Sequence, residues 1–244
     1  MKLITANIWG GRMIYRLPAF FDQESADIIC MQEVNDLAGR TGGVFETLDM
    51  LQQKGGFTDK FMASDLSYHY MNRVAEYGNA ILSNLPLGNR EVVFVQGAYQ
   101  PDYDETDEDH PRNFQHATVT VDGKNVHLVN FHGAFIQASK DGNEDTMRHV
   151  QTIADYAARF SDEPTIITGD FNLAPDSESM QILSRRFRNL PVEYGITSTY
   201  SPVLHVYNVI CDYIFVNEHV QVRSLHAADE IVSDHKPLVM EFDI

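Results

Sequence analysis

The segments Ser233-Asp234-His235 and Gly169-Asp170-Phe171-Asn172 carry the side chains best suited to chemistry in this chain. Each adjoins an apolar run that predicts a buried strand, residues 165–168 before the Gly-Asp segment and 237–240 after the Ser-Asp-His segment. Carboxylate and carboxamide oxygens bind hard cations, and a histidine titrates near neutrality. Groups of these types, aimed by a rigid sheet at one point, indicate metal-assisted hydrolysis of a phosphoester.

The elements that must hold these groups alternate between strand-like and helix-like patterns. Residues 3–9 and 26–31 predict the first two buried strands, the second ending at Gln32-Glu33, and 115–121 with 125–131 predict a hairpin about Asp122-Gly123. Short strands outnumber helices and often adjoin as hairpins. We therefore expect a core of two sheets with helices outside rather than a purely parallel sheet.

Helices and two long loops are also expected, the first helical pattern running through Tyr15, Phe20 and Phe21. Val44, Phe45, Leu48 and Leu51 recur at helical spacing before Gly55-Gly56, and Met147 to Ala157 carries an apolar face. The polar stretches 97–113 and 133–145 are expected to be loops, and loops are where substrate specificity usually resides.

Length and composition favour a single catalytic domain spanning residues 1–244, because no linker, internal repeat or composition break divides the chain. No apolar run is long enough to cross a membrane, and Met1-Lys2 leads directly into a strand-like run with no room for a signal peptide. Cys30 and Cys211 both lie in apolar surroundings, which predicts buried free thiols. A cytoplasmic location is therefore expected.

The net charge of −17 bears on the choice of substrate. The chain has 18 basic residues against 35 acidic ones, whereas proteins that hold nucleic-acid backbones use many lysines and arginines. The cluster at 185–188 lies on a helical stretch, where a solvated face or a helix C-terminus explains it. The acidic balance thus favours a small phosphoester over nucleic acid as partner. It does not exclude a small phosphoester, because bound cations would dominate the local field. No feature indicates an obligate protein partner.

Polar residues at the expected strand ends follow a fixed order along the chain: Asn7, Glu33, His132, Asp170 with Asn172, Asp212, and Asp234 with His235. This order and its local motifs resemble the endonuclease/exonuclease/phosphatase superfamily, also called DNase I-like. The matching segments are Ala6-Asn7-Ile8-Trp9, Met31-Gln32-Glu33-Val34, Asn130-Phe131-His132, Gly169-Asp170-Phe171-Asn172, Cys211-Asp212-Tyr213-Ile214-Phe215 and Ser233-Asp234-His235. Each triplet alone is weak evidence, but the ordered set spans nearly the whole chain.

The resemblance implies a four-layer α/β sandwich, in which two central mixed sheets are flanked by helices. It implies dependence on Mg²⁺ or Mn²⁺, which the oxygen-rich candidate ligands also suit. Glu33 would be the main metal ligand, supported by Asn7, and Asp234 a second-metal ligand or a water-orienting residue. A surface or salt-bridged Glu33, and Asn7 as a cap of the following turn, are the structural alternatives.

The resemblance also implies catalytic roles. Asp170 would align or deprotonate the attacking water, and Asn172 would hold a phosphate oxygen. His235, bonded to Asp212, would be the acid/base or charge-stabilising group, and His132 would contact the phosphate or the leaving group. The alternative for the Gly-Asp-x-Asn segment is a turn in which both side chains bond local backbone.

Two further assignments by resemblance are weaker. Arg112 resembles a phosphate-contacting arginine, with a salt bridge inside its acidic loop as the alternative. Glu76 could orient His132 as in the nuclease branch, with a surface pair to Arg73 as the alternative. Relatives often carry an arginine where this chain has the uncharged run 208–211.

We therefore predict a metal-dependent phosphoester hydrolase that acts by in-line attack of water on a small phosphomonoester or compact phosphodiester. An endo- or exonuclease acting on DNA or RNA is the alternative, and a non-catalytic binding module of the same fold is the remote one. The sequence does not distinguish these substrates, one metal from two, or the oligomeric state.

Overall fold

The computed structural model describes residues 1–37, 47–70, 72–104, 110–136, 139–203 and 208–244. Within these residues the strands form two six-stranded mixed sheets, ordered β11-β12-β1-β2-β4-β3 and β5-β6-β7-β8-β10-β9. The first sheet contains β1 (Lys2–Asn7), β2 (Ile28–Leu37), β3 (Asp59–Tyr70), β4 (Arg73–Ser83), β11 (Gln221–Ala227) and β12 (Leu238–Asp243). The second contains β5 (Gly88–Gln96), β6 (Arg112–Val121), β7 (Lys124–His132), β8 (Thr165–Asp170), β9 (Arg188–Asn189) and β10 (Asp212–Val216).

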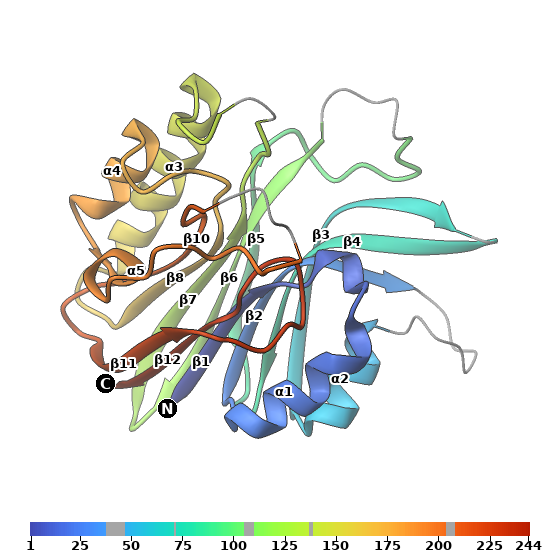
Figure 1. The fold of residues 1–244 in the computed structure, drawn as a ribbon, viewed down its shortest axis with the longest axis horizontal. Helices are drawn as coiled ribbons and strands as arrows, with labels where there is room; N and C mark the ends of the chain where they lie inside the picture. The colour runs from blue at the N-terminus through green and yellow to red at the C-terminus, as the bar shows by residue number, and fades with distance from the viewer. Residues whose placement is uncertain (38–46, 71, 105–109, 137–138, 204–207) are drawn as a thin grey trace.

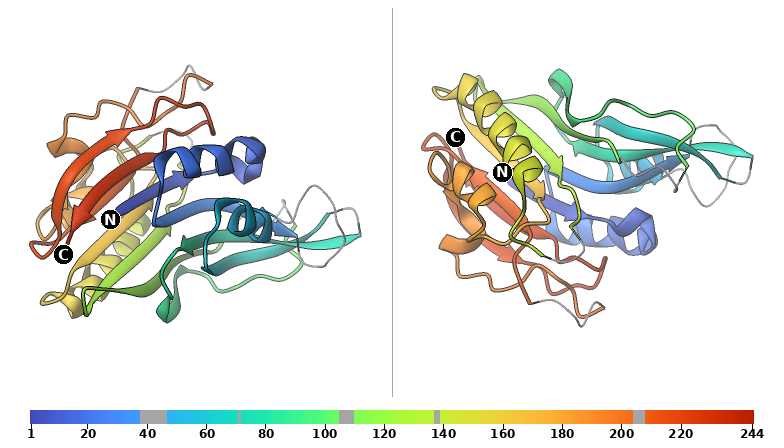
Figure 2. Two further views of the ribbon diagram at one scale, coloured as in Figure 1. Left: turned by 90° about the horizontal axis from the view of Figure 1, so that it is seen from below. Right: turned by 90° about the horizontal axis from the view of Figure 1, so that it is seen from above.

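Helices cover the two outer faces of this pair of sheets (Figures 1 and 2). On the first sheet lie α1 (Leu17–Glu24) and α2 (Thr47–Gly55), preceded by the short helices η1 (Trp9–Gly11) and η2 (Ile14–Arg16). On the second lie α3 (Glu144–Ala157), η3 (Ala158–Phe160), α4 (Glu178–Ser184) and α5 (Leu190–Glu193). The expected four-layer α/β sandwich is confirmed.

Three apolar clusters correspond to the three interfaces between these layers. The middle cluster packs Leu3, Ile28 and Ile81 of the first sheet against Leu128 and Ile214 of the second. All five side chains are completely buried, and strands buried on both faces read as continuous apolar runs. Burying such side chains contributes about 1.5–3 kcal/mol each, which makes the sheet pair a rigid base for groups at its edge.

The hairpin of β6 and β7 turns at Asp122-Gly123 as expected, with Val121 paired to Lys124. Cys30 and Cys211 are buried free thiols, also as expected. Val44 and Phe45 lie outside the described residues, and α2 begins at Thr47. Arg185 caps the C-terminal end of α4, which is the expected place for the basic cluster.

Strand β2 is longer than the sequence predicts, since it continues through Glu33 to Leu37. Its pairing with β4 shifts register between Met31 and Val34, and Glu33 itself has a φ of 54°. This irregularity is a bulge, which bends a strand and redirects a side chain. Apolar alternation does not reveal it, because the residues on both sides of the bulge remain strand-like.

Glycines allow the backbone of neighbouring strands to approach closely beside this edge. Gly169 has a φ of 140°, and a Cβ there would lie well inside van der Waals contact with the carbonyl oxygen of Phe131. Gly169 is paired with Phe131 in the parallel ladder of β7 and β8. The close approach brings the ends of these two strands, and thus His132 and Asp170, to one level.

Candidate active site

Strand pairing gathers the polar residues at one edge of the sandwich. His132 is paired with Asp170 where β7 and β8 end, and Asp212 is paired with the same Asp170 at the start of β10. Asn7 ends β1 in the other sheet, and its amide reaches Asp170 across the interface. Residues far apart in the chain therefore meet at a single point.

The amide of Asn7 lies between two carboxylates. Its Nδ2 donates to Glu33 Oε1 at 2.9 Å and to Asp170 Oδ2 at 3.0 Å. Its Oδ1 accepts from the backbone N–H of Trp9 at 3.0 Å, which fixes the orientation of the amide. Asn7 thus links the two sheets and presents hydrogen-bond donors to both acids.

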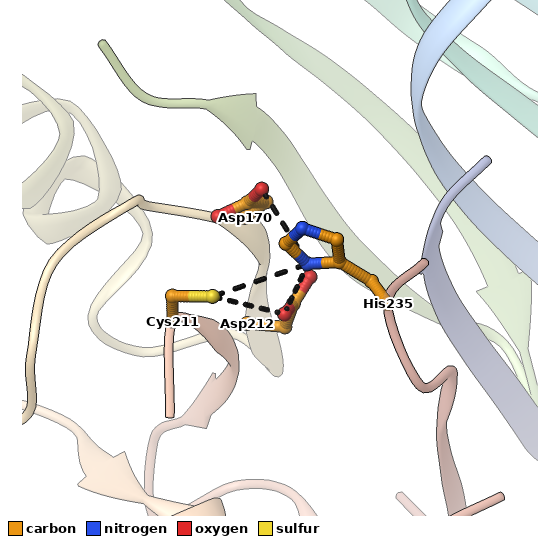
Figure 3. A group of neighbouring side chains, drawn as sticks. All are labelled: Asp170, Cys211, Asp212 and His235. Carbon is orange, nitrogen blue, oxygen red and sulfur yellow. Dashed lines mark hydrogen bonds and ion pairs between the residues drawn. The ribbon is translucent and has the colours of Figure 1, made fainter. Parts of the chain in front are cut away.

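His235 and Asp212 form a buried pair, shown in Figure 3 with Asp170 and Cys211. His235 Nδ1 lies 2.8 Å from Asp212 Oδ2 and 3.7 Å from Asp170 Oδ2. Burial alone would lower the pKa of His235, but the charges of Asp212 and Asp170 outweigh it and raise this pKa well above its ordinary value. The ring is therefore an imidazolium at neutral pH.

Neighbouring residues hold the ring of His235 in place. The ring of Tyr200 packs against it with centroids 4.7 Å apart. The backbone N–H of Lys236 donates to Thr199 O at 2.6 Å, and that of Ser201 donates to Asp234 O at 2.8 Å. The backbone on either side of His235 is thus hydrogen-bonded to the segment 199–201.

His132 is the opposite case, a neutral histidine. Arg112 Nη1 lies 3.3 Å from His132 Nδ1, and because a guanidinium only donates, Nδ1 must accept and the proton resides on Nε2. Burial, followed by the charge of Arg112, lowers the pKa of His132 to about 3. His132 Nε2 therefore presents an N–H toward Glu33 Oε1, 3.7 Å away, and Asp170 Oδ2, 4.0 Å away.

Arg112 itself lies 8% exposed at the beginning of β6. The buried carboxylate of Asp65 acts electrostatically on Arg112 and accepts from the backbone N–H of the next residue, Asn113, at 2.9 Å. Burial raises the pKa of Asp65 to about 7, with the charge of Arg112 acting against that rise. Asp65 thus lies behind Arg112. The acidic residues of the loop at 105 and 107–109, to which the alternative salt bridge was expected, lie outside the described residues.

Two contacts fix the side-chain amide of Asn172. Lys140 Nζ donates to Asn172 Oδ1 at 2.8 Å, and Asn172 Nδ2 donates to Gly133 O at 3.3 Å. Its backbone N–H donates to Asp170 Oδ1 at 2.8 Å, in a turn where Asn172 has a φ of 57°. The turn expected as the alternative therefore exists, and it also places the Asn172 amide 3.5 Å from His132 Nε2.

A cavity of about 440 Å³ opens over these groups. Its walls include the predicted residues Glu33, Arg112, His132, Asp170, Asn172, Asp234 and His235. Asp234 is 7% exposed and accepts from Ser233 Oγ at 3.0 Å, while burial raises the pKa of its carboxyl group. The structure thus brings the candidates together, with Asn7 and Asp212 directly behind the wall residues they contact.

The potential metal ligands at this site fit a hard divalent cation. Glu33, Asp170 and Asp234 supply carboxylate oxygens, and burial raises the pKa of Glu33, so a cation nearby would relieve the cost of its charge. The tighter cluster of Asp170, Cys211, Asp212 and His235 fits less well. Burial raises the pKa of the Cys211 thiol to about 12, and His235 Nδ1 is already bonded to Asp212. Glu33 is the better ligand candidate.

Glu76 is not brought to His132. Its Oε1 accepts from Tyr99 OH at 3.0 Å, and Arg112 occupies the Nδ1 side of the imidazole that Glu76 was expected to orient. The expectation that Glu76 orients His132 is wrong for this structure. The cause is the adjacent strand β6, whose first residue reaches the ring.

Several cavity or cavity-edge residues were not expected from the sequence, among them Tyr77 and Phe135. Trp9 and His110 line the cavity together with Tyr200, and Lys140 lies beside it on Asn172. Trp9 and His110 are each two residues from a motif residue, Asn7 and Arg112, which was an available signal. Lys140 and Tyr200 lie in loops remote from every motif, and only the fold reveals them.

No helix among the described residues is both long and apolar enough to cross a membrane. No curated protein sequence matches the chain.

The fold is that of the DNase I-like class. An endonuclease/exonuclease/phosphatase from Beutenbergia cavernae superimposes with a TM-score of 0.79 at 18% identity, over 99% of this chain and 71% of that one. A mannosyl-6-phosphatase from Bacteroides thetaiotaomicron matches with a TM-score of 0.75 at 14% identity, over 100% of both chains. D. rerio TDP2 complexed with a single-strand DNA product matches with a TM-score of 0.71 at 15% identity, over 100% and 99%.

The family model of the endonuclease/exonuclease/phosphatase family matches residues 4–235. The chain therefore belongs to that family, as the ordered motifs predict. Hydrolysis of phosphoester bonds is the chemistry of the class.

Proposed function

We propose that the protein is a divalent-metal-dependent hydrolase of a small phosphomonoester or compact phosphodiester. The observation that carries the proposal is a pair of donors with no acceptor between them. His132 Nε2 must carry a proton, and the Asn172 amide is fixed with Nδ2 toward that atom, 3.5 Å away. Gly133 O accepts one N–H of the Asn172 amide, and the carboxylate oxygens nearest His132 Nε2 lie 3.7 and 4.0 Å away, beyond hydrogen-bond distance. A phosphoryl oxygen would supply the acceptor for the His132 N–H and for the second amide N–H of Asn172.

Asp170 is suited to orient or deprotonate the attacking water. Burial disfavours its carboxylate, but the positive charge of His235, together with that of Lys140 and the hydrogen bond from Asn7, holds the pKa of Asp170 below its usual value. One oxygen, Oδ1, is used by the backbone of Asn172, while Oδ2 faces His132, His235 and the Asn7 amide. The aimed, ionised oxygen supports a role as water-positioning base.

His235 is suited to stabilise charge that develops on the phosphate. Its imidazolium lines the cavity, and Asp212 fixes the Nδ1 proton so that Nε2–H remains to donate. A cation held by Glu33 and its neighbours would supply Lewis-acid polarisation of the phosphoryl oxygens. The side chains proposed for these roles are Asn7, Glu33, Arg112, His132, Asp170, Asn172, Asp212, Asp234 and His235.

The size of the cavity and the net charge of the chain support a small substrate. A cavity of about 440 Å³ is at the lower end of ordinary ligand pockets, and the chain carries a net charge of −17. Nucleic acid remains the second candidate, because a structural neighbour holds a single-strand DNA product. The structural neighbour that is a mannosyl-6-phosphatase supports the first.

The test is hydrolysis by the purified protein with Mg²⁺, Mn²⁺ or EDTA. The substrates are bis(4-nitrophenyl) phosphate, 4-nitrophenyl phosphate, a hexose phosphate, plasmid DNA and a single-stranded oligonucleotide. We expect EDTA-sensitive release from one or more small esters. Preferential cleavage of DNA would replace the small-ester proposal with the nuclease, and no hydrolysis with either metal would leave a binding module.

A further inference from the structure

A second hollow of about 670 Å³ adjoins the active-site cavity. Tyr77 and His110 line both, and their rings pack edge to face with centroids 5.6 Å apart, so they form the ridge between the two spaces. We call the second hollow the tyrosine groove. Its rings are Tyr68, His69, Tyr70, Tyr77, Tyr103 and His110.

The groove is built by segments that none of the catalytic motifs includes. Tyr68 and Tyr70 lie at the end of β3, on the hairpin with β4 that projects from the sandwich (Figure 1). Tyr103 lies in the loop after β5, and its ring packs against His110 with centroids 5.4 Å apart. The groove is thus an aromatic extension of the site, and the ridge of Tyr77 and His110 separates the two.

The charges of the groove disfavour an anionic ligand. Arg12 is the one lysine or arginine among the described residues that line it, and its guanidinium lies over the ring of Trp9 at 4.9 Å. Asp102 and Asp104 also line it, and His69 Nε2 lies 3.0 Å from Asp102 Oδ1. Burial lowers the pKa of His110 to about 4, so the ridge carries no positive charge at neutral pH.

The rings nevertheless offer a matched surface to an uncharged ring. Aromatic faces bind flat or apolar ring faces, while tyrosine hydroxyls and carboxylates hydrogen-bond to polar edges. A linear polyol or a further phosphate would use neither the ring faces nor the acidic edge. The combination suits an uncharged ring with one apolar face and hydroxyl groups at its rim.

We propose that the tyrosine groove binds the alcohol part of the substrate, and that this alcohol is an uncharged, hydroxyl-bearing ring. The inference rests on the proposed phosphoester hydrolase, whose phosphoryl group lies in the adjoining cavity. Hexopyranose phosphates and nucleoside monophosphates both contain such an uncharged ring with hydroxyl groups. Glycerol phosphate has hydroxyls without a ring and serves as the comparison substrate.

The first test compares kcat/KM for a hexose phosphate, a nucleoside monophosphate and glycerol phosphate. We expect at least about tenfold preference for a ring substrate, expressed in KM, and the two ring substrates identify which ring is bound. Equal kcat/KM values for all three would overturn the groove assignment while leaving the hydrolase intact. If the protein hydrolyses neither these three substrates nor the nitrophenyl esters, the proposed function itself is wrong.

The second test uses Tyr70→Ala and Tyr103→Ala. Each should raise KM for the ring substrate about three- to tenfold, with kcat and the KM of glycerol phosphate unchanged. Tyr194→Ala is the matched control, because Tyr194 is 40% exposed, as Tyr70 is at 39%, but lies on the far side by α5. Equal loss on ring and linear substrates would contradict a ring-binding role.

A binding measurement separates the groove from turnover. Trp9 is the only tryptophan in the chain and lines the active-site cavity, so its fluorescence reports occupation of the site. In Asp170→Asn protein, titration with hexose phosphate and with inorganic phosphate should give a tighter apparent Kd for the ring ester. Tyr70→Ala should remove that difference without altering phosphate binding. Identical affinities for the ring ester and for phosphate would refute the proposal.

Discussion

His235 Nδ1 and Asp212 Oδ2 are 2.8 Å apart, and the pair is buried where the chain after Ser233 meets the first residue of β10. The bond keeps the Nδ1 proton in place and leaves Nε2–H as the second donor of the imidazolium. Because the pKa of His235 is raised, the ring stays charged below that raised value and loses its charge as the pH rises through it. Activity that needs the imidazolium is thus retained at neutral pH and lost on the alkaline side.

Asp212→Asn should move this alkaline limb toward lower pH, because the variant lacks the charge that raises the pKa of His235. We expect kcat at neutral pH to fall about 100-fold or more. The measurement is kcat from pH 5 to 10 at saturating metal, and Asp155→Asn is the exposed control. An unchanged alkaline limb in Asp212→Asn protein would rule out this role for the pair.

Lys140→Met should free the amide of Asn172, since Lys140 Nζ is the donor that fixes Asn172 Oδ1. A misoriented amide turns an acceptor toward the phosphoryl oxygen, so we expect kcat to fall about tenfold or more. Lys140→Arg should recover part of the loss. Thermal unfolding should stay near wild type, and Lys124→Met, at the exposed first residue of β7, should alter neither quantity. Unchanged kcat in Lys140→Met would show that Gly133 O alone orients the amide.

Asn7→Ala should weaken binding of Mg²⁺ or Mn²⁺ about 10- to 100-fold, because Asn7 Nδ2 orients the Glu33 carboxylate. Glu33→Gln should weaken it further by removing the charge. Titration of Trp9 fluorescence with each metal measures the affinity, with Glu218→Gln as the remote control. Equal affinities in wild type, Asn7→Ala and Glu33→Gln would place the metal elsewhere.

Sequence patterns predict most of the fold for a physical reason. Buried strands such as 165–170 and 212–216 are continuous apolar runs, and their polar terminal residues Asp170 and Asp212 mark the edge of the sheet. The ordered motifs then indicate which terminal residues belong to one site. Asn7, His132 and Asp234 were predicted in this way and lie together.

Some features of the site could not be predicted from the sequence, because they depend on contacts between segments that carry no periodic pattern. The bulge at Glu33 is an exception to strand alternation, and Lys140 reaches Asn172 from a loop. Arg112 reaches His132 across neighbouring strands, whereas Glu76, which was expected to orient that ring, binds Tyr99. Which partner each of these side chains contacts is determined by packing in three dimensions and not by the local sequence pattern.

Acid should destabilise the fold through a buried histidine remote from the site. His116 Nε2 lies 3.0 Å from His127 Nδ1, and its Nδ1 lies 2.9 Å from Tyr156 OH, with Glu91 and Arg159 also acting on it. Burial, then His127, lowers the pKa of His116 from 6.5 to about 4. Between these values the unfolded chain binds more protons, so the free energy of unfolding is fully present above pH 6.5 and falls as the pH drops toward 4.

Between pH 7.5 and pH 5, the expected loss in the free energy of unfolding is on the order of 2 kcal/mol. Urea unfolding of wild type and His116→Gln at pH 7.5 and 5 measures it. The variant should be less stable at pH 7.5 but show a smaller difference between the two pH values. His226→Gln, at an exposed histidine, should keep the wild-type difference. An identical pH difference in His116→Gln would assign the acid sensitivity to other groups.

Gly169→Ala should be severely destabilising, because its Cβ would overlap the carbonyl oxygen of Phe131 and the φ of 140° disfavours any side chain. We expect a loss of about 3 kcal/mol or more. Gly123→Ala separates the two causes, because Gly123 has a φ of 81° but nothing within 4 Å of a Cβ, so its cost should be only about 1 kcal/mol. Chemical denaturation of both variants is the measurement. Equal costs would mean that β7 and β8 can separate to accept a methyl group.

The most direct measurement is single-turnover and steady-state hydrolysis of bis(4-nitrophenyl) phosphate and 4-nitrophenyl phosphate by wild type, Asp170→Asn and His235→Ala, with circular dichroism to verify folding. The wild type should turn over at least one ester with Mg²⁺ or Mn²⁺. Both folded variants should lose at least about 100-fold in kcat, because in the proposed function Asp170 would orient the water and His235 would stabilise the phosphate charge. Wild-type turnover by either folded variant would contradict the assignment of this site.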